Sequence, residues 1–296
     1  MKGLRLFLMI LAGLALITLF PQAVFGQKDG DTRQIYVYLP TQVVGLDGPA
    51  GNPNTYEYLT VMTFTVRPGV PGSFYAWHFD SSGKKMQLRI SGVNGSSFEA
   101  TESGGSIVPG GSITLTYSYC QDNQFGGCPN TNIRSGWTRF QVGQTFSVAS
   151  GWQYDTLISV VFQRRDNLGF PKIVADAPVV ELDTSFIIPA SVTTGGIDSG
   201  IAIVNPSDQL ANLSFQIFND VGQLKGSKQL TLNAAYQLSE FVSQLFPNLP
   251  LDGLGNMLTS GQLRISSDTP IAVLSLKSYT APGFFNMGGG AAFVVK

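Results

Sequence analysis

Histidine and charged side chains are scarce in this sequence of 296 residues. Its one histidine, His78, leaves no spare imidazole for a serine or cysteine triad. If the surrounding segment is a strand, Trp77 and Phe79 face one side while His78 faces the other, which we expect to be solvent. We therefore predict a protein that is not an enzyme, with no catalytic residue and no cofactor.

Charged residues make up 12% of the chain, and the formal net charge is −1. No basic tract offsets this balance, so we expect no nucleic-acid partner and no attraction to an anionic membrane. Pairs of carboxylates are the remaining route to catalysis, because glycoside hydrolysis uses two facing acids. The acidic residues lie mostly at turns or beside Gly, Ser or Asn, where solvation and turn formation explain them.

Cysteine is limited to Cys120 and Cys128, which flank a glycine-containing loop. In an exported protein such a pair most simply forms a disulfide, whose entropic contribution would be at most about 2.5 kcal/mol. A metal site is the alternative and would need further ligands. Oxygen ligands for calcium are present at Asp122 and Asp80, but neither stands in a spaced calcium-loop pattern, so an ordinary polar turn is favoured over a structural calcium ion.

Long apolar runs are limited to the N-terminus, where residues 1–26 have the pattern of a signal peptide. Lys2 and Arg5 precede an apolar run of 15 residues, Leu6–Phe20, and cleavage is expected before Gln27. An uncleaved anchor is the alternative, but the run is shorter than the ~20 residues that span a bilayer. We expect an exported protein, extracellular, at the cell surface or periplasmic, with no membrane insertion after cleavage.

Glycine, phenylalanine and tyrosine are abundant, with 34, 20 and 10 copies, and this composition favours sheet over helix. Leu59–Val66 alternates apolar and polar residues with a period of two, as a strand with one buried face does. Pro40 and Pro189 are expected to end strands, and Ser239–Phe246 is expected to form two helical turns with Ser239 as N-cap. The sequence predicts an all-β protein of two tandem antiparallel, immunoglobulin-like sandwiches at 34–180 and 186–296.

An internal repeat supports this division. Ser135–Phe140 matches Ser260–Ile265, so that Arg139 corresponds to Arg264 and Trp137 to Gln262. The first copy carries insertions, among them Ser91–Gly105, the cysteine loop and Ser150–Asp155. Because insertions belong to loops and loops often carry function, the first copy is the better place to look for a binding site.

Turn and strand signals of the second copy, including Val204-Asn-Pro206 and Asp268-Thr-Pro270, resemble the uncharacterised immunoglobulin-like β-sandwich repeats of secreted proteins from environmental bacteria. The resemblance covers 186–285 well and 35–180 in patches, where Arg67 stands in place of the asparagine before proline. It implies a sandwich fold and export. It implies no catalytic residue.

Aromatic side chains near the insertions are the candidate ligand-stacking residues, namely Trp137, Trp152 and Tyr154. The alternative is that Trp137 covers a sheet edge and Trp152 fixes its loop. We predict a secreted or cell-surface, non-enzymatic structural or adhesive protein whose partner is a surface polysaccharide or another surface protein. A carbohydrate-binding module and a fibre subunit that adds its strand Ala291–Val295 to a neighbour are the alternatives, and the oligomeric state stays open.

Overall fold

The computed structural model describes residues 27–46, 56–92, 96–118, 133–166, 170–251, 255, 257–281, 284–291 and 293–294. The expected signal segment, the expected disulfide between Cys120 and Cys128, and Asp122 lie outside these residues. The described residues divide into two compact units: one comprises those of 27–33 and 144–153, the other those of 34–143 and 154–294. Within the larger unit we call residues 34–143 and 154–177 the first lobe and residues 183–294 the second lobe.

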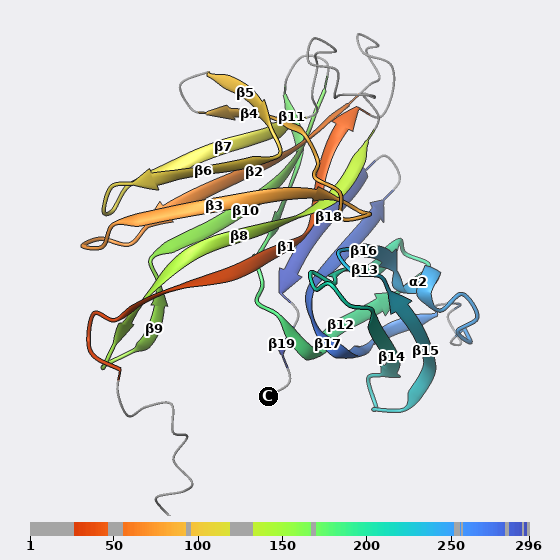
Figure 1. The fold of residues 1–296 in the computed structure, drawn as a ribbon. Helices are drawn as coiled ribbons and strands as arrows, with labels where there is room; N and C mark the ends of the chain where they lie inside the picture. Colours follow the sequence, from red (N-terminus) through yellow and green to blue (C-terminus); the bar gives the residue numbers. More distant parts are fainter. Residues whose placement is uncertain are drawn as a thin grey trace, which may run out of the picture. The chain divides into compact units, whose positions relative to one another are not determined.

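The first half of the chain forms a sheet of 11 antiparallel strands. The strands are β1 (Thr32–Leu46), β2 (Glu57–Val66), β3 (Gly72–Asp80), β4 (Leu88–Gly92), β5 (Ser97–Ala100), β6 (Glu102–Ile107), β7 (Ser112–Ser118), β8 (Arg134–Ser147), β9 (Gly151–Tyr154), β10 (Thr156–Arg165) and β11 (Pro171–Ala177). Strand β1 joins two ladders, β5-β4-β7-β2 with β10 and β11, and β8-β3-β6 (Figure 1). Phe64 of β2 stacks on Phe74 of β3 at 3.6 Å between ring centroids, so the two ladders share one core.

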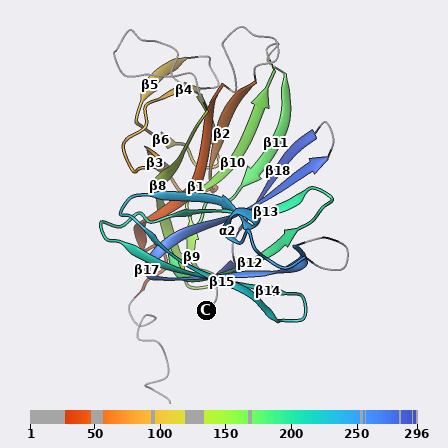
Figure 2. The same cartoon turned by 90° about the vertical axis from the view of Figure 1, so that its right-hand side faces the viewer.

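The second lobe is a sheet of eight antiparallel strands. Its elements are β12 (Asp183–Val192), β13 (Ile197–Val204), β14 (Ala211–Asn219), β15 (Leu224–Leu232), β16 (Gln237–Phe241), α2 (Val242–Leu245), β17 (Leu258–Ala281), β18 (Phe284–Ala291) and β19 (Phe293–Val294). Strand β17 is 24 residues long; its first part pairs with β14 and β12, and its second part with β13 and β18. Figure 2 shows this long strand with β14 and β13 at different points along it. The chain is therefore an all-β protein with two antiparallel sheets.

The two lobes repeat one local arrangement of a hairpin turn beside a long strand. The equivalent cross-strand pairs are Phe79–Trp137 and Asp80–Gly136 in the first lobe, and Phe218–Gln262 and Asn219–Gly261 in the second. In both lobes the strand glycine lies directly against a backbone carbonyl: a Cβ would be 2.0 Å from the oxygen of Phe79 at Gly136 and 2.1 Å from that of Phe218 at Gly261. The sequence match around Arg139 and Arg264 therefore corresponds to the same strand register.

The hairpin turns also match. The Asp80 carboxylate accepts hydrogen bonds from the backbone N–H groups of Ser82 and Lys84, at 2.9 and 3.0 Å, and the Asn219 side chain accepts one from Gln223 at 2.8 Å. Gly83 and Gly222 adopt φ of 79° and 77°, which a residue with a Cβ rarely does. Asp80 therefore has a structural role as the turn's hydrogen-bond acceptor.

The first lobe contacts the second through this turn and through Trp137. The Trp137 indole stacks on Phe79 at 4.2 Å and donates from Nε1 to the carbonyl of Ala235 at 3.2 Å. Gln237 donates from Nε2 to the Pro40 carbonyl at 2.8 Å. The core of the first lobe also includes side chains of the second, among them Leu274. The two lobes thus share buried side chains.

Several expected strand and loop boundaries are wrong, because strands pair with their neighbours beyond the predicted ends. Pro40 lies inside β1. This strand pairs with β2 only at Gly45 and Leu46, so the absence of an N–H group at Pro40 costs no β1–β2 hydrogen bond. Pro189 lies inside β12, opposite Gln262 of β17. The expected insertion Ser91–Gly105 contributes to the paired strands β4, β5 and β6.

The expected helix is also shorter than predicted. Ser239 lies in β16 and pairs with Ala202, so helix α2 begins only after Phe241, whose backbone N–H donates to the Gln244 side chain. Near the C-terminus, β19 pairs with Phe186 and Ile187 of β12. The last described strand is therefore paired within its own chain.

The Asn-Pro signal of the second lobe has a structural explanation. Asn205 is fully buried, and its Nδ2 lies within hydrogen-bond distance of the carbonyls of Gln209, Leu232 and Asn233, at 2.7, 3.2 and 3.1 Å. In the first lobe Arg67 takes the place expected for this asparagine, and its guanidinium lies 3.4 Å from the Asp155 carboxylate.

We expect Asn205→Asp to lower the free energy of unfolding by about 3 kcal/mol or more. The change replaces a buried donor that faces carbonyl oxygens with an acceptor, which is either charged and unpaired or protonated at a cost. Urea unfolding followed by circular dichroism measures the difference. Asn233→Asp, at an exposed neighbouring position, is the matched control and should change stability by less than about 0.5 kcal/mol; equal losses would contradict the role of Asn205.

Candidate binding surface

His78 is buried, which corrects the expectation that it faces solvent. It has no exposed surface, and its Nδ1 lies 3.2 Å from Gln42 Oε1 and 3.1 Å from Thr138 Oγ1. Strand alternation does separate it from Trp77, but the core lies on the His78 side because Phe74 and Ala76 are buried there. Burial lowers the pKa of His78 from 6.5 to about 3, so the imidazole is neutral at physiological pH.

Trp137 is also internal. Its side chain is 2% exposed and is held by Phe79, Ala235 and Tyr38. An indole in this position offers no face to a ligand in solvent. The structure therefore gives Trp137 a role in the contact between lobes, and the expected stacking role is left to Trp152 and Tyr154.

Trp152 belongs to the smaller unit and lies in β9, which pairs with β8. The Arg33 guanidinium lies 4.2 Å from the centroid of its ring, and Phe146 meets it edge-on at 5.4 Å. Arg33 also donates from Nε to Gln144 Oε1 at 2.9 Å. One face of the indole is therefore occupied by a cation.

Tyr154 belongs to the larger unit and packs partly against the first-lobe core. Its hydroxyl donates to the Glu181 carboxylate. The ring thus has a structural environment of its own, and the structure does not bring Tyr154 and Trp137 together as one surface.

Sequence reasoning missed the aromatic surface that the fold assembles on the outer face of β1, β8 and β3. Tyr36 and Tyr75 are 49% and 50% exposed, and Trp77 lies between them, with ring centroids 6.3 Å from Tyr36 and 5.3 Å from Tyr75. Arg139 lies over two of these rings, with its guanidinium carbon 5.1 Å from the Tyr36 centroid and 4.7 Å from that of Trp77. We call Tyr36, Tyr75, Trp77 and Arg139 the aromatic platform.

Polar groups and one glycine border the platform. Tyr75 and Trp77 pair across to Gly104 and Glu102 of β6. A Cβ on Gly104 would lie 3.0 Å from Tyr75 Cδ2, so the ring lies against a strand that has no side chain there. Glu102 forms an exposed ion pair with Lys85 at 3.8 Å. The platform is therefore an apolar strip with hydrogen-bonding groups beside it.

The second lobe shows that the scaffold does not require these rings. The register places Gln216 and Ser214 where the first lobe has Trp77 and Tyr75, whereas Arg264 keeps its place over Phe218 at 4.5 Å. The contact of arginine with phenylalanine is common to both lobes and belongs to the scaffold. The aromatic side chains at the positions of Tyr75 and Trp77 are particular to the first lobe.

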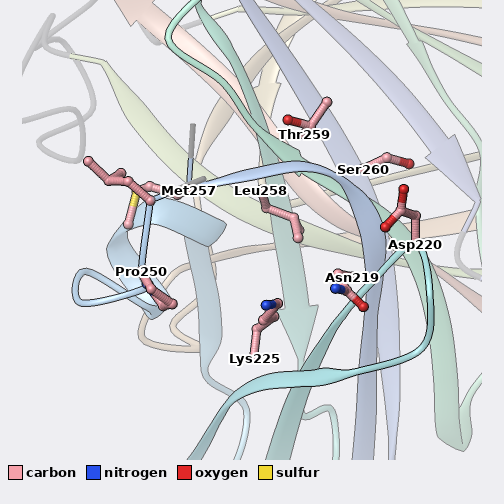
Figure 3. A pocket seen from close by; sticks show the side chains of 9 residues that line it. Asn219, Asp220, Lys225, Pro250, Met257, Leu258, Thr259 and Ser260 are labelled. Atoms are coloured by element: carbon pink, nitrogen blue, oxygen red, sulfur yellow. The ribbon is translucent and has the colours of Figure 1, made fainter. Parts of the chain in front are cut away.

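A cleft of about 350 Å³ opens at the end of the second lobe, beside its hairpin turn. Figure 3 shows Lys225, Asn219 and Leu258 projecting into the same space, with Asp220 at its edge. The equivalent end of the first lobe is covered, since its turn packs on Ala235. The cleft has no aromatic side chain in its lining, so it offers a ligand no ring on which to stack, in contrast to the platform.

Two other properties concern the described residues only. None of their helices is long and apolar enough to cross a membrane. No group of three or more His, Cys, Asp or Glu side chains among them is placed to hold a metal ion.

Comparison with known proteins adds little. No protein-family model matches the chain, and no curated protein sequence matches it. Similar solved structures include Thermotoga maritima 1070 (8% identity, 38% of this chain and 94% of that chain, TM-score 0.31) and the pilus backbone of Streptococcus pneumoniae (10%, 89% and 82%, 0.16). A β-glucuronidase of Bacteroides uniformis has 11% identity and a TM-score of 0.17 over 88% of this chain, which spans 26% of that enzyme. TM-scores this low establish neither a common fold nor a common function.

Proposed function

We propose that this protein is exported and acts without catalysis as an adhesive β-sandwich protein, attached to a surface polymer through the aromatic platform of its first lobe. The observation that supports this most is that Tyr36 and Tyr75 are exposed on either side of Trp77 in one lobe, whereas the other lobe has Ser214 and Gln216 at the positions of Tyr75 and Trp77. Exposed aromatic clusters bordered by polar groups mark binding surfaces. The signal-like N-terminus supports export, and the burial of the one imidazole supports a role without acid-base catalysis.

The test is retention of the chain from Gln27 on a panel of insoluble polysaccharides. We expect the double variant Tyr36→Ala/Tyr75→Ala to reduce retention at least about tenfold, which corresponds to about 1.4 kcal/mol. Both side chains are half exposed, so the fold and the melting temperature should stay unchanged.

Phe98→Ala is the matched control, because Phe98 is 51% exposed but lies on β5, away from the platform. It should retain full binding. Equal retention of the parent and the double variant would contradict the site, and no retention of the parent on any polymer would contradict the proposed function.

A further inference from the structure

We infer that the platform binds an acidic polysaccharide and that Arg139 receives a carboxylate of the sugar chain; this inference rests on the proposed function. The starting point is the position of Arg139 in the middle of the rings. Its guanidinium carbon lies 5.1 Å from the centroid of Tyr36, 4.7 Å from that of Trp77 and 6.0 Å from that of Phe79. A cation over ring faces is attracted by them, but its N–H edges are still able to donate hydrogen bonds.

Arg139 has no anionic partner among the described residues. Ion pairs there join Arg67 with Asp155 and Lys85 with Glu102. The Nε of Arg139 is buried and has no hydrogen-bond partner in the described chain, so a ligand from solvent would meet the guanidinium at its two terminal Nη groups. An arginine fork is well suited to a carboxylate, because two parallel N–H groups match its two oxygens. The platform therefore offers one positive, hydrogen-bonding group surrounded by apolar surface.

A sugar chain is the expected ligand under the proposed function, and the two tyrosines alone are smaller than a protein interface. A tyrosine buries roughly 150–250 Å² when it is covered, so the two half-exposed tyrosines offer on the order of 200 Å². A stable protein interface buries about 800 Å² on each partner. Neighbouring ring centroids are 5.3 and 6.3 Å apart, and the ring planes are inclined by 33° and 57°. The rings thus do not form one flat surface, and we expect a sugar ring to stack on one tyrosine at a time.

The charge of the whole protein does not produce this preference. Without Lys2 and Arg5, the chain has 18 − 2 = 16 basic and 19 acidic residues, so its net charge is −3. Attraction to a polyanion must come from the local group, and acidic ligands that do not stack on the rings should be repelled. Binding is therefore expected to require the rings and the guanidinium together.

The experiment compares polygalacturonate with its fully methyl-esterified form, which has the same sugar chain without the free carboxylates. Titration calorimetry with the chain from Gln27 should show binding to the free acid about tenfold tighter than to the ester. Arg139→Met should remove this difference and Arg139→Lys should reduce it, because lysine keeps the charge but lacks the fork. Arg264→Met is the matched control: it removes the corresponding arginine of the second lobe and should leave the preference unchanged.

The outcomes separate the two proposals. Equal affinity for acid and ester, or a preference that survives Arg139→Met in a folded variant, overturns the acidic ligand and leaves the adhesive function standing. Binding to other polysaccharides through Tyr36 and Tyr75 without binding to polygalacturonate or its ester also overturns it. Failure to bind any polysaccharide overturns both proposals.

Discussion

Acidification from pH 6.5 to pH 3 is expected to lower the free energy of unfolding by up to about 5 kcal/mol through His78 alone. The pKa of this imidazole is about 3 in the folded protein, against 6.5 for an ordinary histidine, because it is completely buried. Between these values the unfolded chain binds more protons than the folded one, so stability falls as the pH falls. Below pH 3 both states are protonated and the contribution stops changing.

The measurement is urea unfolding at intervals between pH 7 and pH 3, for the parent and for His78→Gln. Glutamine is neutral throughout and is able to hydrogen-bond Gln42 and Thr138, which contact the imidazole. Carboxylates affect both proteins alike, so the difference between the two curves isolates His78. Because the chain has one histidine, nuclear magnetic resonance observes its titration without overlap. An imidazole that titrates near 6.5 in the folded protein, or identical curves for the two proteins, would refute the prediction.

Gly261→Ala is expected to lower the free energy of unfolding by about 3 kcal/mol or more, although it adds only one methyl group. Its Cβ would lie 2.1 Å from the Phe218 carbonyl oxygen, and that oxygen belongs to a strand fixed by its pairing with β17. The backbone must therefore shift, and a side-chain rotation does not relieve the contact. Gly105→Ala is the control, since the nearest atom there would be 3.6 Å away.

The same variant tests whether the lobes unfold together. Gly261 lies in the second lobe, whereas all three tryptophans precede that lobe, and Trp137 donates to Ala235 across the contact. Because the lobes share buried side chains, tryptophan fluorescence and circular dichroism should report one transition, shifted equally by Gly261→Ala. A fluorescence transition that stays in place while the circular dichroism curve splits in two would show that the lobes unfold independently.

Much of the local structure was predictable because its causes are local. The alternation of Leu59–Val66 was enough to identify β2, and the polar residue and glycine of the two hairpin turns were enough to locate them. The predicted start of the helix at Ser239 is wrong because Ser239 pairs with Ala202, a residue distant in sequence. The predicted strand ends at Pro40 and Pro189 are also wrong. A proline ends a strand only where a neighbouring strand needs its N–H group, and that depends on which strand lies beside it.

The candidate site was not predictable to the same degree. Tyr36, Trp77 and Arg139 come from three strands that only the sheet order brings together, and no pattern within one segment marks them as a group. Trp137 was a reasonable candidate from the sequence, but the second lobe covers it. The internal repeat pointed to the first copy, but through its insertions, whereas the platform lies on the paired strands β1, β3 and β8.

The sequence was sufficient to predict the β-class, the position of most strands, the turn chemistry and the equivalence of Arg139 with Arg264, since hydrophobic period and turn residues act over a few positions. It also determined that His78 and Trp77 lie on opposite faces of one strand. Which of these two faces is buried could not be predicted, because that depends on the side of the sheet on which the rest of the chain packs. For the same reason the fold buried His78 and Trp137 and left the rings of Tyr36 and Tyr75 half exposed.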